Sequence, residues 1–83
     1  MKVPTIHSNG TSRDELLRQV CDAGQAICDA LNKMCDAAPN GRDYYPQGDG
    51  ALKEATQEHR SRVARLESVL DEYMELAEQI ADQ

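Results

Sequence analysis

The stretch VCDAGQAICDALNKMCDAAPN, residues 20–40, contains three successive seven-residue segments that share Cys, Asp and Ala at equivalent positions. Its apolar and small residues recur at alternating spacings of four and three. They are Val20, Gly24, Ile27, Leu31, Met34 and Ala38. This spacing places them on one face of an α-helix and is typical of helices that pack against another helix. The stretch therefore predicts a long amphipathic helix.

Local signals set the bounds of this helix. Ser12 is followed three residues later by Glu15, a capping box in which both side chains can satisfy backbone amides at a helix start. Pro39 disfavours helical backbone in the residue before it. We therefore predict that the first helix covers residues 12–38.

A second pattern with 4-3 spacing follows a connection of residues 39–50 and predicts a helix over 51–81. Its members are Leu52, Thr56, His59, Val63, Leu66, Leu70, Tyr73, Ala77 and Ile80. Residues 1–11 contain Pro4 and the turn-forming pair Asn9-Gly10, so we expect them to form an extended arm.

These elements predict an all-α protein with a single domain of residues 1–83, an antiparallel two-helix hairpin with an extended N-terminal arm. Val69, Met74 and Leu76 widen the apolar face of the second helix beyond one seam. A chain this short also buries only roughly 60% of the surface that it exposes when unfolded. We therefore expect the hairpin to oligomerise into a helical bundle, most simply as a homodimer.

The composition limits the classes of partner. A formal net charge of −6 argues against general nucleic-acid binding, although a local cluster of arginines could still hold a small anion. The chain has no apolar run of membrane-spanning length and no signal-peptide pattern, so we expect no membrane partner and a cytoplasmic location. We expect no cofactor.

Three cysteines, Cys21, Cys28 and Cys35, lie seven residues apart. Neighbouring Cα atoms would be about 10.5 Å apart along a helix, too far for a disulfide within it. The spacing also fails for a zinc site, so we expect no metal. Small buried thiols are the simplest interpretation; a disulfide between subunits or a redox role is the alternative.

Basic residues gather at His59, Arg60, Arg62 and Arg65. They could form a solvated face paired with nearby acids, with His59 hydrogen-bonded in the core. They could instead bind an anion, because the arginine side chain binds phosphate through two parallel hydrogen bonds. No nucleophile–base pair can be assembled, so we predict that the protein is not an enzyme.

The connection RDYYPQGDG, residues 42–50, holds two of the three tyrosines. Tyr44 and Tyr45 could close the end of the bundle, or they could offer a platform on which a base stacks while Arg42 contacts a phosphate. At the other end of a hairpin, the arm residues Asn9 and Thr11 could belong only to a turn and cap. In an antiparallel dimer they would instead meet the tyrosines of the neighbouring subunit and complete a shared site.

Three strings carry a resemblance that covers nearly the whole chain. They are IHSNGTS at residues 6–12, PNGRDYYPQGDGA at 39–51 and EHRSR at 58–62. Together they resemble a group of small uncharacterised proteins of tailed bacteriophages and prophages. The resemblance assigns no role to any residue, and the Cys-Asp-Ala heptads lie outside the shared pattern. It implies the function classes of small helical phage proteins, which include assembly factors, regulators and inhibitors of host defence.

Some of those inhibitors are oligomeric sponges that sequester nucleotide signals. Our leading hypothesis is such a binding protein, with a ligand of the cyclic oligonucleotide or cyclic ADP-ribose type. Its predicted ligand-binding residues are Arg42, Tyr44, Tyr45, His59, Arg60 and Arg62, with Asn9 and Thr11 from a neighbour. The alternative is a structural, assembly or regulatory module that binds another protein through its acidic second helix.

Overall fold

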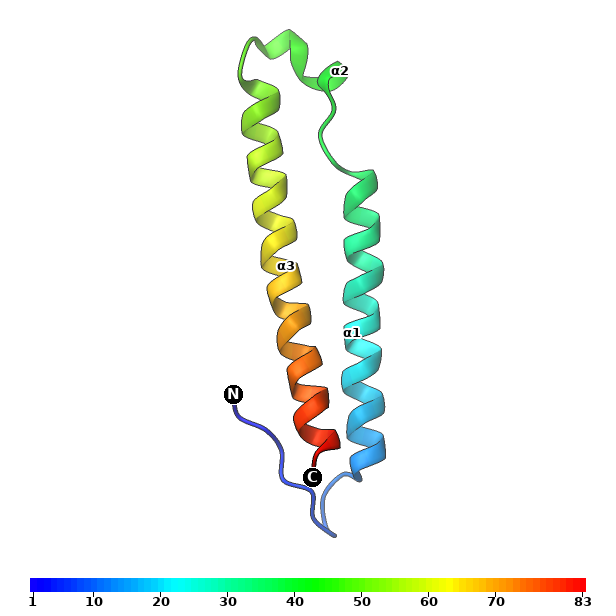
Figure 1. The fold of residues 1–83 in the computed structure, drawn as a ribbon. Helices are drawn as coiled ribbons and strands as arrows, with labels where there is room; N and C mark the ends of the chain where they lie inside the picture. Colours follow the sequence, from blue (N-terminus) through cyan, green and yellow to red (C-terminus); the bar gives the residue numbers. More distant parts are fainter.

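A computed structural model describes residues 1–83 and confirms an all-α chain without strands. The elements in chain order are α1 (Arg13–Asp36), α2 (Gly41–Tyr44), a short 3₁₀ helix η1 (Tyr45–Gln47) and α3 (Ala51–Ala81). Helices α1 and α3 lie side by side and run in opposite directions, with α2 and η1 at one end and both termini near the other (Figure 1).

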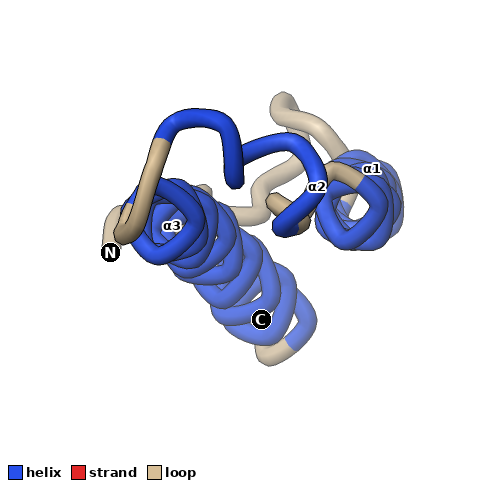
Figure 2. Tube along the Cα trace, turned by 90° about the horizontal axis from the view of Figure 1, so that it is seen from above, coloured by secondary structure: helices blue, strands red, loops and turns tan.

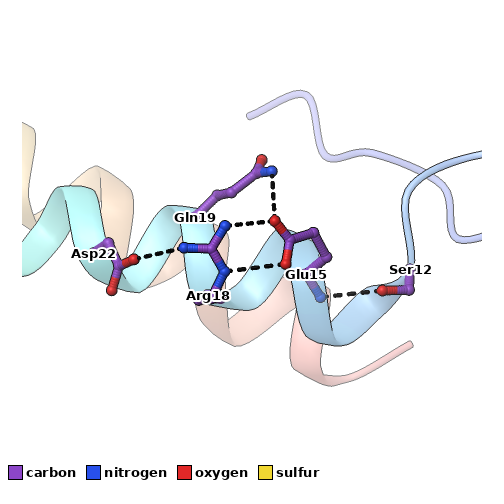
Figure 3. A network of polar contacts seen from close by, with 5 residues as sticks. All are labelled: Ser12, Glu15, Arg18, Gln19 and Asp22. Atoms are coloured by element: carbon purple, nitrogen blue, oxygen red, sulfur yellow. Dashed lines mark hydrogen bonds and ion pairs between the residues drawn. The ribbon is translucent and has the colours of Figure 1, made fainter.

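The start of α1 is held by its cap and by a network of exposed polar side chains (Figure 3). Ser12 Oγ accepts a hydrogen bond from the Glu15 backbone N–H at 3.2 Å. The Glu15 carboxylate does not reach back as a full capping box would require. It accepts hydrogen bonds from Arg18 and Gln19, and Arg18 also pairs with Asp22 at 3.0 Å.

Helix α1 ends at Asp36, two residues earlier than the expected position 38. The backbone N–H groups of Ala37 and Ala38 bond to carbonyls three residues back, which tightens the last turn before Pro39. Ala38 is exposed and outside the helix, so the apolar face of α1 ends at Met34.

The connection between α1 and α3 differs from the expected loop because it contains α2 and η1. Asn40 caps α2: its side chain accepts from the Arg42 N–H at 3.0 Å and donates to the Asp43 carboxylate at 2.9 Å. Gly48 and Gly50 then turn the chain into α3 with φ values of 96° and 90°, a region that favours glycine. Seen along the helices, the connection crosses the end of the hairpin from α1 to α3 (Figure 2).

The N-terminal arm contains no helix or strand and folds back beside the C-terminal half of α3 (Figure 1). Met1 and Lys2 line a shallow pocket together with Val69, Glu72, Tyr73 and Leu76 of α3. The arm therefore covers part of the apolar flank of its own hairpin.

The hairpin buries very little of its apolar surface. Ile80, in the last turn of α3, is the one buried residue among 83. The accessible surface is 6231 Å², whereas a compact monomer of this mass would expose roughly 4,900 Å². The molecule measures 62 × 20 × 16 Å, so it is a rod without an interior. Side chains such as Met74, which is 61% exposed, consequently remain in water.

No helix of the protein carries an apolar segment of the length and hydropathy needed to cross a bilayer.

The Glu15 network predicts a specific response to acid. Hydrogen bonds from Arg18 and Gln19 lower the pKa of Glu15 to about 2 from its ordinary 4.5. The contribution of ionised Glu15 to stability is therefore present above pH 4.5 and is lost as the pH falls from 4.5 to 2. We expect the thermal midpoint, followed by circular dichroism, to fall more between pH 5.5 and 2.5 in the wild type than in Glu15→Gln.

Glu54→Gln is the matched control, because Glu54 lies in the first turn of α3 and its side chain makes no hydrogen bond. That variant should lose as much stability on acidification as the wild type does. Equal losses in the wild type and Glu15→Gln would contradict the assignment.

Candidate functional site

The three predicted site residues of the connection lie together at one end of the rod. Arg42 and Tyr44 belong to α2, and Tyr45 begins η1. Tyr44 is half-buried and lines a shallow pocket whose other members are Gln47, Ala51, Glu54, Ala55 and Glu58. Tyr45 is 79% exposed, so its ring is available to a partner or ligand.

The predicted basic residues follow in the N-terminal half of α3. His59 is half-buried, which fits its place on the apolar seam. Arg60 is exposed and forms no ion pair or side-chain hydrogen bond. Arg62 lies 3.6 Å from Glu58, and both side chains are more than half exposed. Because exposed pairs of this kind contribute only about 0–1 kcal/mol, Arg62 is only weakly committed to Glu58.

A second pocket lies farther along α3 than His59 and Arg60, toward the middle of the rod. Arg62 and Arg65 line it together with three apolar residues, Met34 from α1 and Leu66 and Val69 from α3. Arg65 is anchored by a hydrogen bond from its Nε to the Ser61 carbonyl at 3.3 Å. We refer to these five lining residues as the arginine groove. It combines an apolar floor with two guanidinium groups.

The predicted site omitted Arg65, although the sequence shows it within the basic cluster. Its position next to the seam residue Leu66 is the signal that could have placed it beside the apolar groove. Only the packing of Met34 from α1 against α3 shows that a pocket forms there.

Asn9 and Thr11 are exposed and belong to the segment before α1. This segment lies at the opposite end of the hairpin from α2 and η1, which contain the tyrosines (Figure 1). Within one chain they cannot join Arg42, Tyr44 and Tyr45, because the length of α1 separates them. A site that uses both groups requires two chains.

The cysteines were expected to be small buried thiols, and this prediction is wrong for the single chain. Cys21 and Cys35 are exposed and Cys28 is half-buried. Cys21 and Cys28 line an apolar groove on the flank opposite the arginine groove, with Tyr73 and Met74 among its other members. No group of three His, Cys, Asp or Glu side chains is arranged to hold a metal ion.

No protein-family model, curated protein or solved structure matches this chain. The residues around the connection and the first half of α3 offer cationic, hydrogen-bonding and aromatic groups. That combination is suited to binding an anion that carries a flat ring.

The cap of α2 should control the two tyrosines. Replacing Asn40 with Ala removes the acceptor for the Arg42 N–H and the donor to Asp43, which should destabilise the turn by about 0.5–2 kcal/mol. We expect the ring resonances of the half-buried Tyr44 and the backbone resonances of the exposed Tyr45 to move toward random-coil positions in NMR spectra, while the resonances of Tyr73 stay unchanged. Asn32→Ala, an exposed change in α1, is the control and should move none of them. Unchanged Tyr44 and Tyr45 resonances in Asn40→Ala would show that the cap does not position them.

Proposed function

We propose that this chain is a non-enzymatic binding protein that sequesters a small nucleotide-derived signal between the subunits of a homo-oligomer. The ligand class is a cyclic oligonucleotide or a cyclic ADP-ribose relative. In this proposal the protein is phage-encoded, acts in the host cytoplasm and counters a host defence that uses such a signal. The observation that carries it is the exposed set of Arg42, Tyr45 and Arg60, whose side chains have no ionic or hydrogen-bonding partner within the chain.

The oligomer is supported by the amount of surface, polar and apolar together, that the chain leaves exposed. A single chain exposes roughly 1,300 Å² more than a compact monomer of its mass. A stable interface takes about 800 Å² from each partner, so the excess is sufficient for one. Apolar grooves on both flanks of the hairpin offer surface for a neighbouring chain.

The basic residues supply the phosphate contacts in this proposal. Arg42 and Arg60 are exposed cations without an internal partner. A phosphate that approaches Arg62 competes only with Glu58, and that exposed pair is weak. A guanidinium group can donate two parallel hydrogen bonds to one phosphate, which gives both affinity and a defined orientation.

The tyrosines supply the contact to the base. Tyr45 presents most of its ring to solvent, while Tyr44 is held partly against α3. Stacking of a base on an aromatic side chain contributes about 1–3 kcal/mol and tolerates different bases. His59, half-buried on the seam, adds a ring nitrogen that can donate to or accept from the ligand.

A neighbouring chain would supply the remaining residues. In an antiparallel pairing, the turn that precedes α1 of one chain lies beside α2 of the other. Asn9 and Thr11, both exposed, would then add an amide and a hydroxyl to the site. A nucleotide bound there would be enclosed by two subunits, which suits sequestration better than an open surface does.

Calorimetry against cyclic dinucleotides, cyclic trinucleotides and cyclic ADP-ribose forms tests the proposal. We expect at least one of them to bind the oligomer. Arg60→Ala should weaken that binding by about tenfold or more, because a charged hydrogen bond contributes roughly 1.5–3 kcal/mol. Tyr45→Phe should bind almost normally, since it keeps the ring, and Tyr45→Ala should not.

Lys33→Ala is the control for net charge, because Lys33 is an exposed cation on α1 outside the proposed site. It should leave the affinity unchanged. If the protein in the calorimeter is a folded oligomer and none of the nucleotides gives a heat of binding, the proposal is contradicted.

The second candidate is a protein-binding module of a phage structural, assembly or regulatory type. It is favoured by the acidic C-terminal part of the chain, which has six acids and no base from Leu66 onward. Five of them lie in α3, namely Glu67, Asp71, Glu72, Glu75 and Glu78, and Asp82 follows the helix. All six are exposed, so they could dock a basic partner. Recovery of one stoichiometric basic protein from infected cells, lost at high salt, would favour this function over nucleotide binding.

A further inference from the structure

Gln83 contacts residues on both sides of the turn that precedes α1, residues 7–12. Its side-chain Nε2 donates to the Pro4 carbonyl at 2.6 Å, and its Oε1 accepts from the Ile6 backbone N–H at 2.9 Å. Its backbone carbonyl accepts a hydrogen bond from Arg13 Nη1 at 2.9 Å. Gln83, which lies just beyond α3, thus contacts the chain on both sides of residues 7–12.

We propose that Gln83 is a clamp that positions the loop of residues 7–12 on the end of the hairpin. Its side-chain amide donates and accepts at once, and so satisfies a carbonyl and an N–H of the extended arm as a neighbouring strand would. A glutamate of the same length could only accept when ionised, and a lysine could only donate. The chemistry of the contact is therefore specific to an amide side chain.

The clamped loop is short and is tied internally. The Gly10 N–H bonds to the His7 carbonyl at 3.1 Å, and Ser12 caps α1 directly after the loop. The His7 ring lies over Gly10 so closely that an added Cβ would be 2.8 Å from Nε2. Because the turn has these contacts of its own, its place on the hairpin is set chiefly by the attachments at its base.

The same clamp keeps the arm against α3. Ile6 is half-buried although it belongs to neither helix. The first residues of the arm continue to the pocket that Val69, Tyr73 and Leu76 line. Release of the Ile6 and Pro4 bonds would free these residues to leave the hairpin and would uncover that flank.

The functional consequence rests on the proposed function. Asn9 and Thr11 lie in the clamped loop and are the two residues that a chain would offer to its neighbour. Gln83 is in this view a positioning residue, because it contacts the loop rather than the ligand. Its loss should weaken binding without removing any ligand contact.

Amide hydrogen exchange at Ile6, followed by NMR in the full chain, tests the clamp itself. In Gln83→Ala we expect exchange of the Ile6 amide to be roughly five- to tenfold faster, while amides in the middle of α1 and α3 stay as protected as in the wild type. Gln83→Glu keeps the acceptor for the Ile6 N–H and loses only the donor to Pro4, so at neutral pH its Ile6 amide should exchange more slowly than that of Gln83→Ala. Gln79→Ala is the matched control, because the Gln79 amide bonds only to Glu75 one turn earlier.

Unchanged exchange at Ile6 in Gln83→Ala, or an equal effect of Gln79→Ala, would overturn the clamp. The consequence for binding is read separately as the affinity for whichever cyclic nucleotide the wild type binds, which Gln83→Ala should weaken and Gln79→Ala should not. Faster exchange at Ile6 in a protein that binds none of the nucleotides would support the clamp and contradict the proposed function. Faster exchange with an unaltered affinity would overturn the positioning role.

Discussion

The structure depends on the contact between two amphipathic helices that are too few to enclose a core. Each of α1 and α3 has an apolar face wider than the single seam on which they meet. A residue on the seam is covered from one side and remains open on the flanks, which is why Leu31, Leu66 and Leu70 are only half-buried. Ile80 is fully covered near the end where the arm, the start of α1 and the end of α3 come together. The hydrophobic effect consequently holds the rod together weakly along most of its length.

Polar contacts hold the two ends of the hairpin in place. Ser12 caps α1, Asn40 caps α2, and Gln83 joins the arm to the end of α3. Each of these contacts is exposed and individually modest. Together they set the direction of the chain where helices begin and end. They also hold two of the segments that carry candidate site residues, namely the arm and the connection, so loss of a cap at either end should also disturb the proposed site.

The regular spacing of apolar residues made the all-α fold predictable from the sequence. The roles of single polar residues were harder to predict. Apart from Ala38, the residues with 4-3 spacing lie within α1 and α3, because burial of one face acts on every turn of a helix. The Pro39-Asn40-Gly41 sequence indicates the end of a helix. Asn40 is also the N-cap of α2, and because asparagine is common both in turns and at helix starts, the sequence did not show that a second helix begins there. Gln83 carries no pattern at all, since its role depends on which part of the chain happens to lie beside it.

The candidate site shows the same division. The clustering of Arg60, Arg62 and Arg65 is visible in the sequence, whereas the apolar floor of the arginine groove requires Met34 from the other helix. The exposure of Cys21 and Cys35 was not expected, because the heptad pattern places them beside a seam without showing whether anything covers it. We propose one common explanation for the uncovered apolar flanks and for the separated halves of the proposed site, which is that further copies of the chain complete both.

Sedimentation equilibrium at micromolar concentration tests this explanation most directly. We predict a mass that is an integral multiple, at least twofold, of the 9.2 kDa chain. The assembly should persist in moderate salt, because burial of apolar surface stabilises it more than exposed ion pairs do. A stable, fully helical species of 9.2 kDa across the concentration range would contradict it.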